Sequence, residues 1–228
     1  MIAAKYLIVI LIGYLLGSIP FGLIIGKLSA KTDIRQVGSG KTGTTNVLRT
    51  AGKKAAVLVL ILDLAKGALA VLIAGFIFGK GYMAVGGHSF WLTPSAQVLA
   101  ALAAIAGHTW PIFVKFKGGR GVATFLGGMF LICPPAALFG GEVLIIGAGL
   151  TRYMSLGSIA GAVSTYAILM PLTIMNGFPV EYLAYSLIGA IFIIVMHRDN
   201  INRLLSGTER KLGEKTGTKN MHFSATSR

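Results

Sequence analysis

A short glycine-rich segment with three cations, Lys115 to Thr124 (KFKGGRGVAT), has the composition of an anion-binding loop. Glycine lets the backbone turn with positive φ and bring its N–H groups close to a ligand. Cations beside such N–H groups favour a phosphate or a carboxylate. Because strongly apolar runs flank the segment, it predicts a phosphate-type site at the edge of a hydrophobic layer. A basic loop facing anionic lipid headgroups is the alternative, and one glycine-rich match does not decide between them.

A second polar segment, Gly38 to Arg49 (GSGKTGTTNVLR), combines backbone-loosening glycines with many hydrogen-bonding side chains. Arg49 adds a planar guanidinium that can hold a phosphate through two hydrogen bonds. Gly40-Lys41-Thr42 resembles the end of a P-loop, but Arg35 stands where that motif requires glycine and no strand precedes it. ATP binding of that kind is therefore excluded. The plain structural alternative is a loop that ends in a helix N-cap at Thr44 or Thr45.

Asp63, Lys66 and His108 are ionisable residues inside apolar runs. Asp63 and Lys66 are three positions apart and so share one face of a helix. Since an isolated charge at mid-bilayer costs roughly 2.5–3.5 kcal/mol, we expect a structural salt bridge between them. A ligand contact stays open for Lys66 if its helix begins early. We expect His108 to bond a neighbouring helix, with a role as a base as the alternative.

The last apolar run is followed by HRDNINRLLSGTE, His197 to Glu209. A histidine titrates near neutrality unless its surroundings perturb it, so His197 at a helix end could position or deprotonate a hydroxyl. Asn200, three residues on, shares its face. Another helix opens with three polar residues, Arg152, Ser155 and Ser158. The alternative for this end of the chain is a helix terminus whose cations simply suit the helix dipole.

The composition is that of a membrane protein. The chain is 54% hydrophobic and 12% charged, whereas soluble domains are about 25% charged. We expect a single polytopic domain over residues 1–228 with a flexible polar tail from about 210 to 228. Cys133 is the single cysteine, so an internal disulfide is impossible. The net charge of +14 does not indicate a nucleic acid partner, because the cations cluster in short loops between apolar runs.

Membrane helices of about 20 residues must carry the polar segments. The run from Val122 to Leu150 is too long for one ordinary span, and Pro134 and Pro135 interrupt it. Because the residue before a proline avoids helix, we expect two short helices that form a hairpin there. The sequence therefore predicts an all-α integral membrane protein with about seven transmembrane helices. The other five expected spans are Tyr6–Ile25, Ala55–Phe78, Pro94–Phe113, Tyr153–Met175 and Glu181–Met196.

Positive charge predicts the orientation of these spans. Seven cations lie between Lys27 and Lys54, and seven more follow Met196. With seven spans, all the basic segments fall on one side, and only Lys5 and Lys80 fall on the other. We therefore expect the N-terminus outside and the C-terminus in the cytoplasm. All four polar segments then face the cytoplasm.

Together, the polar segments resemble one family. GSGKTGTTNVLR, GHTWPIFVKFKGGRGVAT and HRDNINRLLSGTE occur in this order on one side of short apolar helices. That set resembles the bacterial membrane glycerol-3-phosphate acyltransferases that use acyl phosphate as donor (the PlsY family). GSIPFG from Gly17 and DLAKG from Asp63 also match. This chain has Lys41 where the family usually has asparagine, Thr44 where it usually has alanine, and Arg120 where it usually has lysine.

The resemblance implies transfer of an acyl group from acyl phosphate to the primary hydroxyl of glycerol 3-phosphate, the first acylation of phospholipid biosynthesis. Lysophosphatidic acid and inorganic phosphate are the products. It implies a bacterial inner (cytoplasmic) membrane location, a cytoplasmic active site, and no metal or cofactor. It assigns catalytic roles to Ser39, Arg49, His197 and Asn200. It assigns glycerol 3-phosphate binding to Lys117, Gly118, Gly119 and Gly121, and a structural role to Glu209. We add to the substrate-binding set Gly38, Gly40, Thr45, Asn46, Lys66 and Ser155.

The expected partners are the two substrates, membrane lipid and a soluble enzyme that makes acyl phosphate. A transporter or channel for anionic metabolites is the competing class, because an intramembrane Asp–Lys pair would suit it. The polar segments lie on one side instead of near the midplane, and the sequence has no inverted repeat, which disfavours transport. A non-enzymatic lipid-binding subunit would explain the basic loops but not three distinct polar motifs.

Overall fold

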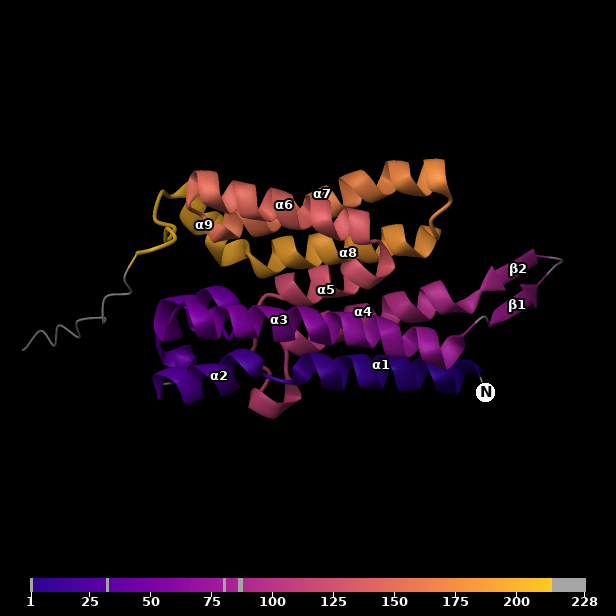
Figure 1. Ribbon diagram of the computed structural model, residues 1–228, viewed down its shortest axis with the longest axis horizontal. Helices are drawn as coiled ribbons and strands as arrows, with labels where there is room; N and C mark the ends of the chain where they lie inside the picture. Colours follow the sequence, from indigo (N-terminus) through magenta and orange to yellow (C-terminus); the bar gives the residue numbers. More distant parts are fainter. Residues whose placement is uncertain (1, 32, 80, 86–87, 215–228) are drawn as a thin grey trace, which may run out of the picture.

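The chain folds into a bundle of helices that run along one long axis (Figure 1). The computed structural model describes residues 2–31, 33–79, 81–85 and 88–214. The helices of the first half are α1 (Ile2–Ser18), α2 (Phe21–Ala30), α3 (Thr44–Phe78) and α4 (Leu92–Thr109). Those of the second half are α5 (Val122–Ile132), α6 (Pro134–Thr151), α7 (Met154–Asn176), α8 (Val180–Met196) and α9 (Arg198–Leu205). Short 3-10 turns, η1 (Ile34–Gln36) and η2 (Ile112–Val114), lie in the loops.

The bundle has two layers. One contains α1 to α4, the other contains α6 to α8, and α5 lies between them (Figure 1). The loop after α2 and the turn into α9 lie at the end of the bundle opposite the start of α1, and the loop before α5 lies inward of that end, near the break between α1 and α2 (Figure 1). The three polar motifs therefore lie in the half of the bundle away from the start of α1.

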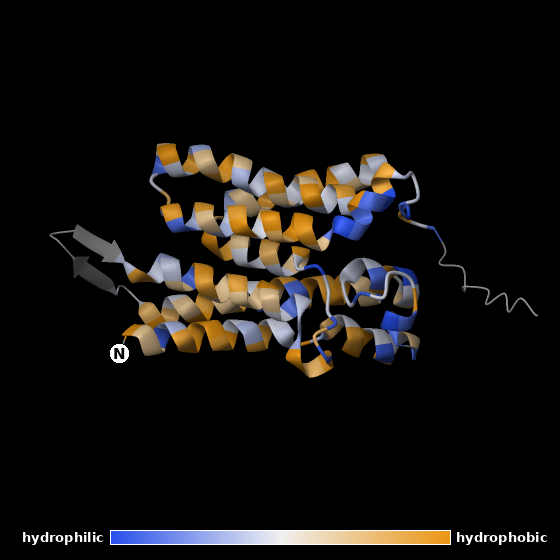
Figure 2. Ribbon diagram, turned by 180° about the vertical axis from the view of Figure 1, so that it is seen from behind, coloured by the Kyte–Doolittle hydropathy of each residue, from blue (hydrophilic) through white to orange (hydrophobic). Residues whose placement is uncertain are grey.

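The helix surfaces are apolar along most of the bundle, and hydrophilic residues concentrate at the end that holds α2 and α9 (Figure 2). Among the described residues, five helical segments are long and apolar enough to cross a membrane, and a sixth qualifies if α8 and α9, bent by 59°, count as one. The apolar α5 has only 11 residues. The protein is thus a multi-pass helical membrane protein, and the count of seven spans stays a prediction.

Small residues bring α1 and α4 together. A Cβ on Gly13 or Gly17 would overlap the backbone of Ala100 or Ala104, so only glycine permits this approach. Without a hydrophobic drive between helices in lipid, such close contact supplies much of the association energy. The first helix is interrupted before Pro20, because α1 ends at Ser18 and α2 begins at Phe21.

The predicted start of the second membrane helix is wrong, because the helix begins within polar sequence. The polar loop expected to reach Lys54 is shorter, because α3 begins at Thr44 and continues through a non-helical residue, Gly52, into the apolar span. The glycine tolerates φ 85° there, which kinks the helix without ending it. The loop after α3 contains an antiparallel hairpin, β1 (Tyr82–Val85) and β2 (His88–Trp91), that the sequence analysis did not predict.

The proline-split run forms two helices, as predicted. α5 ends at Ile132 and α6 begins at Pro134, with the extended residue Cys133 between them. Pro134 and Pro135 occupy the first turn of α6, where a missing N–H costs nothing. Most of the expected flexible tail, residues 215–228, lies outside the described residues.

Candidate active site

A cavity of about 420 Å³ lies between the two layers at the polar end of the bundle. It has a polar end and an apolar arm. The polar end is formed by the loop before α3, the loop before α5, the start of α7 and the turn between α8 and α9. The apolar arm runs between α3, α5 and α6 and is lined by Leu60, Leu64, Val122, Ala123, Leu126, Phe130, Ala137, Leu144 and Ile145.

Three cations line the polar end, namely Lys41, Arg49 and Arg120. Burial lowers the pKa of Arg120 to about 10, and the nearby Arg203 acts in the same direction. The guanidinium is still charged at neutral pH. Its buried Nε has no hydrogen-bond partner among the described residues. A buried, unsatisfied cationic donor at a cavity wall is suited to an anion that the cavity receives.

The loop before α3 is held in place from beneath by Asn46. Its buried amide donates to the carbonyls of Ile34 (2.7 Å) and Lys41 (2.9 Å), and its Oδ1 accepts from the Ser39 N–H at 3.0 Å. Both ends of this side chain are therefore engaged by the loop. Asn46 shapes the wall that carries Ser39, although its predicted role was substrate binding.

His197 presents one ring nitrogen to the cavity. Its Nδ1 lies 2.8 Å from the carbonyl oxygen of Ile193, and because a carbonyl can only accept, Nδ1 carries the proton. Nε2 therefore has a free lone pair. Burial, with the Arg120 cation acting in the same direction, lowers the pKa of His197 to about 4. The imidazole is neutral at physiological pH and lines the cavity as an acceptor.

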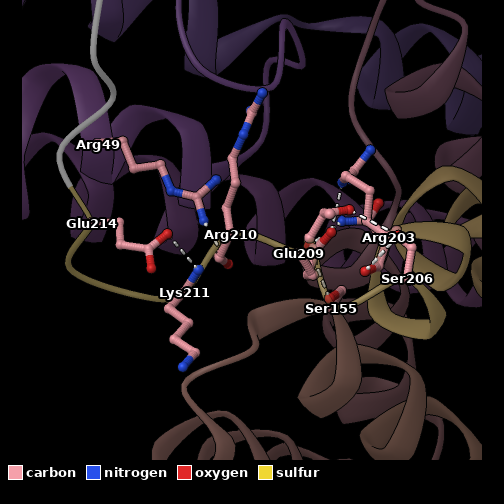
Figure 3. A network of polar contacts seen from close by, with 10 residues as sticks. Arg49, Ser155, Arg203, Ser206, Glu209, Arg210, Lys211 and Glu214 are labelled. Carbon is pink, nitrogen blue, oxygen red and sulfur yellow. Dashed lines mark hydrogen bonds and ion pairs between the residues drawn. The ribbon is translucent and has the colours of Figure 1, made fainter.

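Glu209 is the centre of a polar network that joins α7 to α9 (Figure 3). Its buried carboxylate accepts from Asn200 Nδ2 at 2.7 Å, Ser155 Oγ at 3.1 Å and Arg203 Nε at 2.7 Å. The contact to the carboxylate identifies the Asn200 nitrogen, because an amide oxygen there would repel it. The Asn200 Oδ1 is buried and has no partner among the described residues, so it is free to accept a substrate hydroxyl.

The segment after Glu209 crosses the polar end as a strap, defined here as residues 208–214. Leu212 exchanges two hydrogen bonds with Arg152, one of them backbone to backbone at 2.7 Å. Arg49 donates to the Arg210 carbonyl at 3.4 Å from the other layer (Figure 3). The strap thus connects α3, α6 and α9 above the cavity.

The glycine-rich loop contributes less to the cavity than its sequence suggests. The amides of Gly118 and Gly119 donate to the carbonyls of Thr109 and His108, both at 3.1 Å. A Cβ at either glycine would collide with His108, so both glycines serve close packing against the end of α4. Gly121 does line the cavity, and its φ of 82° turns the chain into α5.

Asp63, Lys66 and His108 form a buried cluster beneath the polar end. Lys66 Nζ lies 2.8 Å from Asp63 Oδ1, and His108 Nδ1 lies 3.5 Å from the same oxygen. The expected structural salt bridge between Asp63 and Lys66 is present. His108 faces Asp63 of a neighbouring helix, but its Nδ1 makes no hydrogen bond among the described residues, so the bond expected of it stays a prediction. Asp63 and His108 also line the cavity, whereas Lys66 points to a small neighbouring pocket beside the α1–α2 break.

The predicted site residues separate into two groups. The cavity is lined by Ser39, Thr45, Asn46, Arg49, Gly121, Ser155, His197, Asn200 and Glu209. It is not lined by Gly38, Gly40, Lys66, Lys117, Gly118 or Gly119. The sequence-based site omitted Lys41, Thr44, Arg120 and Ser158, which also line the cavity. Their signal was present in the motifs, where Lys41 and Arg120 are cations beside glycines.

Curated proteins similar to this chain match it over most of its length. The chain is 60% identical over 215 residues to glycerol-3-phosphate acyltransferase 3 of Dehalococcoides mccartyi (strain CBDB1), covering 94% of this chain and 99% of the relative. It is 43% identical over 205 residues to the glycerol-3-phosphate acyltransferase of Halalkalibacterium halodurans, covering 90% and 94%.

The fold has a solved counterpart. The crystal structure of PlsY, an integral membrane glycerol 3-phosphate acyltransferase, in its glycerol 3-phosphate form matches with a TM-score of 0.78. The two chains are 40% identical, and the match covers 91% of this chain and 96% of PlsY. The lysophosphatidic acid form of PlsY matches with a TM-score of 0.77. The family model for glycerol-3-phosphate acyltransferase matches residues 7–207, and this chain therefore belongs to the glycerol-3-phosphate acyltransferase family.

Proposed function

We propose that this protein transfers a fatty acyl group from acyl phosphate to the primary hydroxyl of glycerol 3-phosphate, giving lysophosphatidic acid and inorganic phosphate. The observation that carries the proposal is one cavity with a cationic polar end and an apolar arm. Acyl phosphate has the same two parts, a phosphate and a hydrocarbon chain. The family of the chain and the substrate and product forms of PlsY support the same reaction.

The polar end of the cavity carries enough positive charge to bind two phosphate groups. Lys41, Arg49 and Arg120 line it, while the carboxylate of Glu209 is already engaged by three donors. Each charge-assisted hydrogen bond to phosphate contributes roughly 1.5–3 kcal/mol. Arg49 and Arg120 also offer planar forks that match phosphate oxygens. We assign phosphate binding to these three cations together with Ser39.

The apolar arm fits the acyl chain. Three rim residues, Leu60, Phe130 and Ile145, are 40%, 50% and 70% exposed on helices that face lipid. A chain held in the arm can therefore extend sideways toward the bilayer. This placement puts the reactive carbonyl at the junction of the arm and the polar end, beside His197 and Asn200.

In the proposed reaction, the glycerol 3-phosphate hydroxyl attacks the acyl carbonyl carbon and the carbonyl–phosphate bond breaks. The new bond is the ester of lysophosphatidic acid, and phosphate leaves with the electron pair of the broken bond. Asn200 Oδ1 and His197 Nε2 are free acceptors that orient the hydroxyl. Because the leaving group is already good, the reaction needs no covalent enzyme intermediate. Ser39 and backbone N–H groups are assigned to the developing oxyanion.

The hydroxyl proton passes to His197 or to a phosphate oxygen. With a pKa of about 4, His197 is a weak base. A phosphate bound to Arg120 offsets the cation that lowers this pKa, so substrate binding makes the imidazole more basic.

The proposed location is the bacterial cytoplasmic membrane with the active site on the cytoplasmic side. The positive-inside rule supports this orientation, because the basic loops and the cavity's polar end share one end of the bundle. A soluble enzyme that makes acyl phosphate is the proposed supplier of the donor.

The test measures release of inorganic phosphate by purified protein in a lipid phase. It supplies palmitoyl phosphate with and without glycerol 3-phosphate, and palmitoyl-CoA as a comparison donor. We expect phosphate release only with glycerol 3-phosphate, matched mole for mole by lysophosphatidic acid. Acylation from palmitoyl-CoA alone would overturn the donor assignment. Uptake of glycerol 3-phosphate into sealed liposomes without acylation would overturn the enzyme assignment in favour of transport.

A further inference from the structure

Two adjacent glycines of α6 have different surroundings. A Cβ on Gly140 would overlap Thr165 and approach the Gly161 carbonyl at 2.7 Å, so this glycine permits the close packing of α6 on α7. A Cβ on Gly141 would meet no other atom within 4 Å. Gly141 is therefore not required for helix packing, although glycine is less favourable than alanine inside a helix.

The empty space beside Gly141 belongs to the apolar arm of the cavity. On α6, Ile145 lies one turn nearer the polar end and Ala137 lies one turn deeper, each about 6 Å away along the helix axis. α5 runs antiparallel to α6 in the hairpin, and Leu126 and Phe130 line the same arm. Gly141 thus lies partway along the route from the polar end to the deep end of the arm.

We propose that Gly141 determines which acyl chains the enzyme accepts. This inference rests on the proposed function, because it assigns the arm to the donor chain. The missing side chain keeps the arm wide at its middle, so that a long chain passes α6 and continues toward the exposed rim at Phe130. Because the Cβ position at Gly141 is open, a larger side chain at this point would extend into the arm and narrow it. Short chains, which end before Gly141, would be affected less.

The experiment compares Gly141→Phe with the wild-type enzyme on octanoyl phosphate and palmitoyl phosphate. Gly149→Phe is the matched control, since Gly149 lies on the same helix with equally open space for a Cβ but does not line the cavity. We expect kcat/KM for palmitoyl phosphate to fall at least about 10-fold relative to octanoyl phosphate in Gly141→Phe, as is typical of filled hydrophobic subsites. Gly149→Phe should keep the wild-type ratio.

Equal losses on both donors, an unchanged ratio, or the same shift in Gly149→Phe would overturn the inference. Wild-type activity is measured first and separates the two proposals. An inactive wild-type protein contradicts the proposed function, whereas an active one with an unshifted Gly141→Phe ratio contradicts only the role of Gly141.

A smaller variant keeps the inference testable if Gly141→Phe does not fold. In a Cys133→Ala background, Gly141→Cys should react with N-ethylmaleimide, and palmitoyl lysophosphatidic acid should slow that reaction. Gly149→Cys should react equally with and without it. A Gly141→Cys thiol that does not react, or that the lipid does not protect, would place this residue away from the chain and overturn the assignment.

Discussion

At the scale of single residues, the site depends on which donor and acceptor atoms the fold leaves unpaired. Asn200 and Asn46 are both buried asparagines. Asn46 has both ends of its amide engaged by one loop, while Asn200 has its nitrogen fixed by Glu209 and its oxygen free. The same type of side chain therefore holds a loop in one place and, in the other, leaves an unpaired acceptor oxygen for the proposed reaction.

The buried neutral His197 predicts a pH effect on stability. Its folded pKa of about 4 is below the unfolded value near 6.5, so the unfolded chain binds more protons between these two pH values. The free energy of unfolding therefore falls as pH decreases from about 6.5 to 4, by roughly 1–3 kcal/mol from this group. Thermal unfolding of wild type and His197→Gln between pH 7.5 and 4.5 checks this, and a parallel decline in both would contradict it.

Replacing Arg49 by lysine should greatly lower kcat/KM, although the charge is kept. Arg49→Lys keeps the charge but replaces a planar fork with a point charge. We expect kcat/KM to fall about 100-fold, which corresponds to roughly 2.7 kcal/mol of transition-state stabilisation. Arg198→Lys is the control, because that arginine is exposed on α9. Unchanged steady-state kinetics of Arg49→Lys would remove this residue from the reaction.

At the scale of elements, glycines and one carboxylate position the site. The loop before α5 packs on the end of α4 through Gly118 and Gly119, which leaves Arg120 and Gly121 to face the cavity. α9 is held to α7 by Glu209. These attachments explain why residues from four separate stretches of sequence share one space.

Loss of the Glu209 network should lower turnover. Glu209→Ala frees Asn200 and leaves Ser155 without its acceptor, so we expect kcat to fall about 10- to 100-fold with a smaller change in KM. Glu214→Ala is the control, since this carboxylate of the same strap accepts only from the exposed Lys211 backbone among the described residues. The kinetics of both variants are measured with both substrates varied. Wild-type kcat in Glu209→Ala would show that Asn200 needs no such support.

At the scale of the whole molecule, the bundle separates a polar end from an apolar body, and its cavity joins the two (Figure 2). α1 begins at one end and α9 lies at the other (Figure 1). In the proposed reaction, the aqueous phosphate ester and the membrane-borne acyl donor would therefore reach one cavity from different directions.

Because the start of α1 and the segment after α9 lie at opposite ends of the bundle, we expect Lys5 and Lys211 to lie on opposite sides of the membrane. In a Cys133→Ala background, Lys211→Cys in intact cells should resist a membrane-impermeant maleimide until the cells are opened. Lys5→Cys should react at once, because the positive-inside rule places the N-terminus outside. Labelling of Lys211→Cys in intact cells would reverse the orientation and place the site outside.

The sequence by itself determined the features that depend on local composition. Apolar runs specified membrane helices, because about 20 apolar residues span a bilayer core. Pro134 and Pro135 specified the α5–α6 break, and grouped glycines, hydroxyls and cations marked the motifs. It also placed Ser39, Arg49, His197 and Asn200 among the candidates, and all four line the cavity.

Only the tertiary structure decided how each polar atom is used. Gly118 and Gly119 look like phosphate ligands in sequence, but their amides bond to α4. Lys66 lies beside the α1–α2 break, while Arg120, outside the predicted set, faces the cavity with an unpaired donor. α3 begins at Thr44, as in the alternative that the sequence offered for this segment, a helix that starts at Thr44 or Thr45. The residue type determines which hydrogen bonds a side chain can make. Which partner it actually bonds depends on how distant segments of the chain pack together.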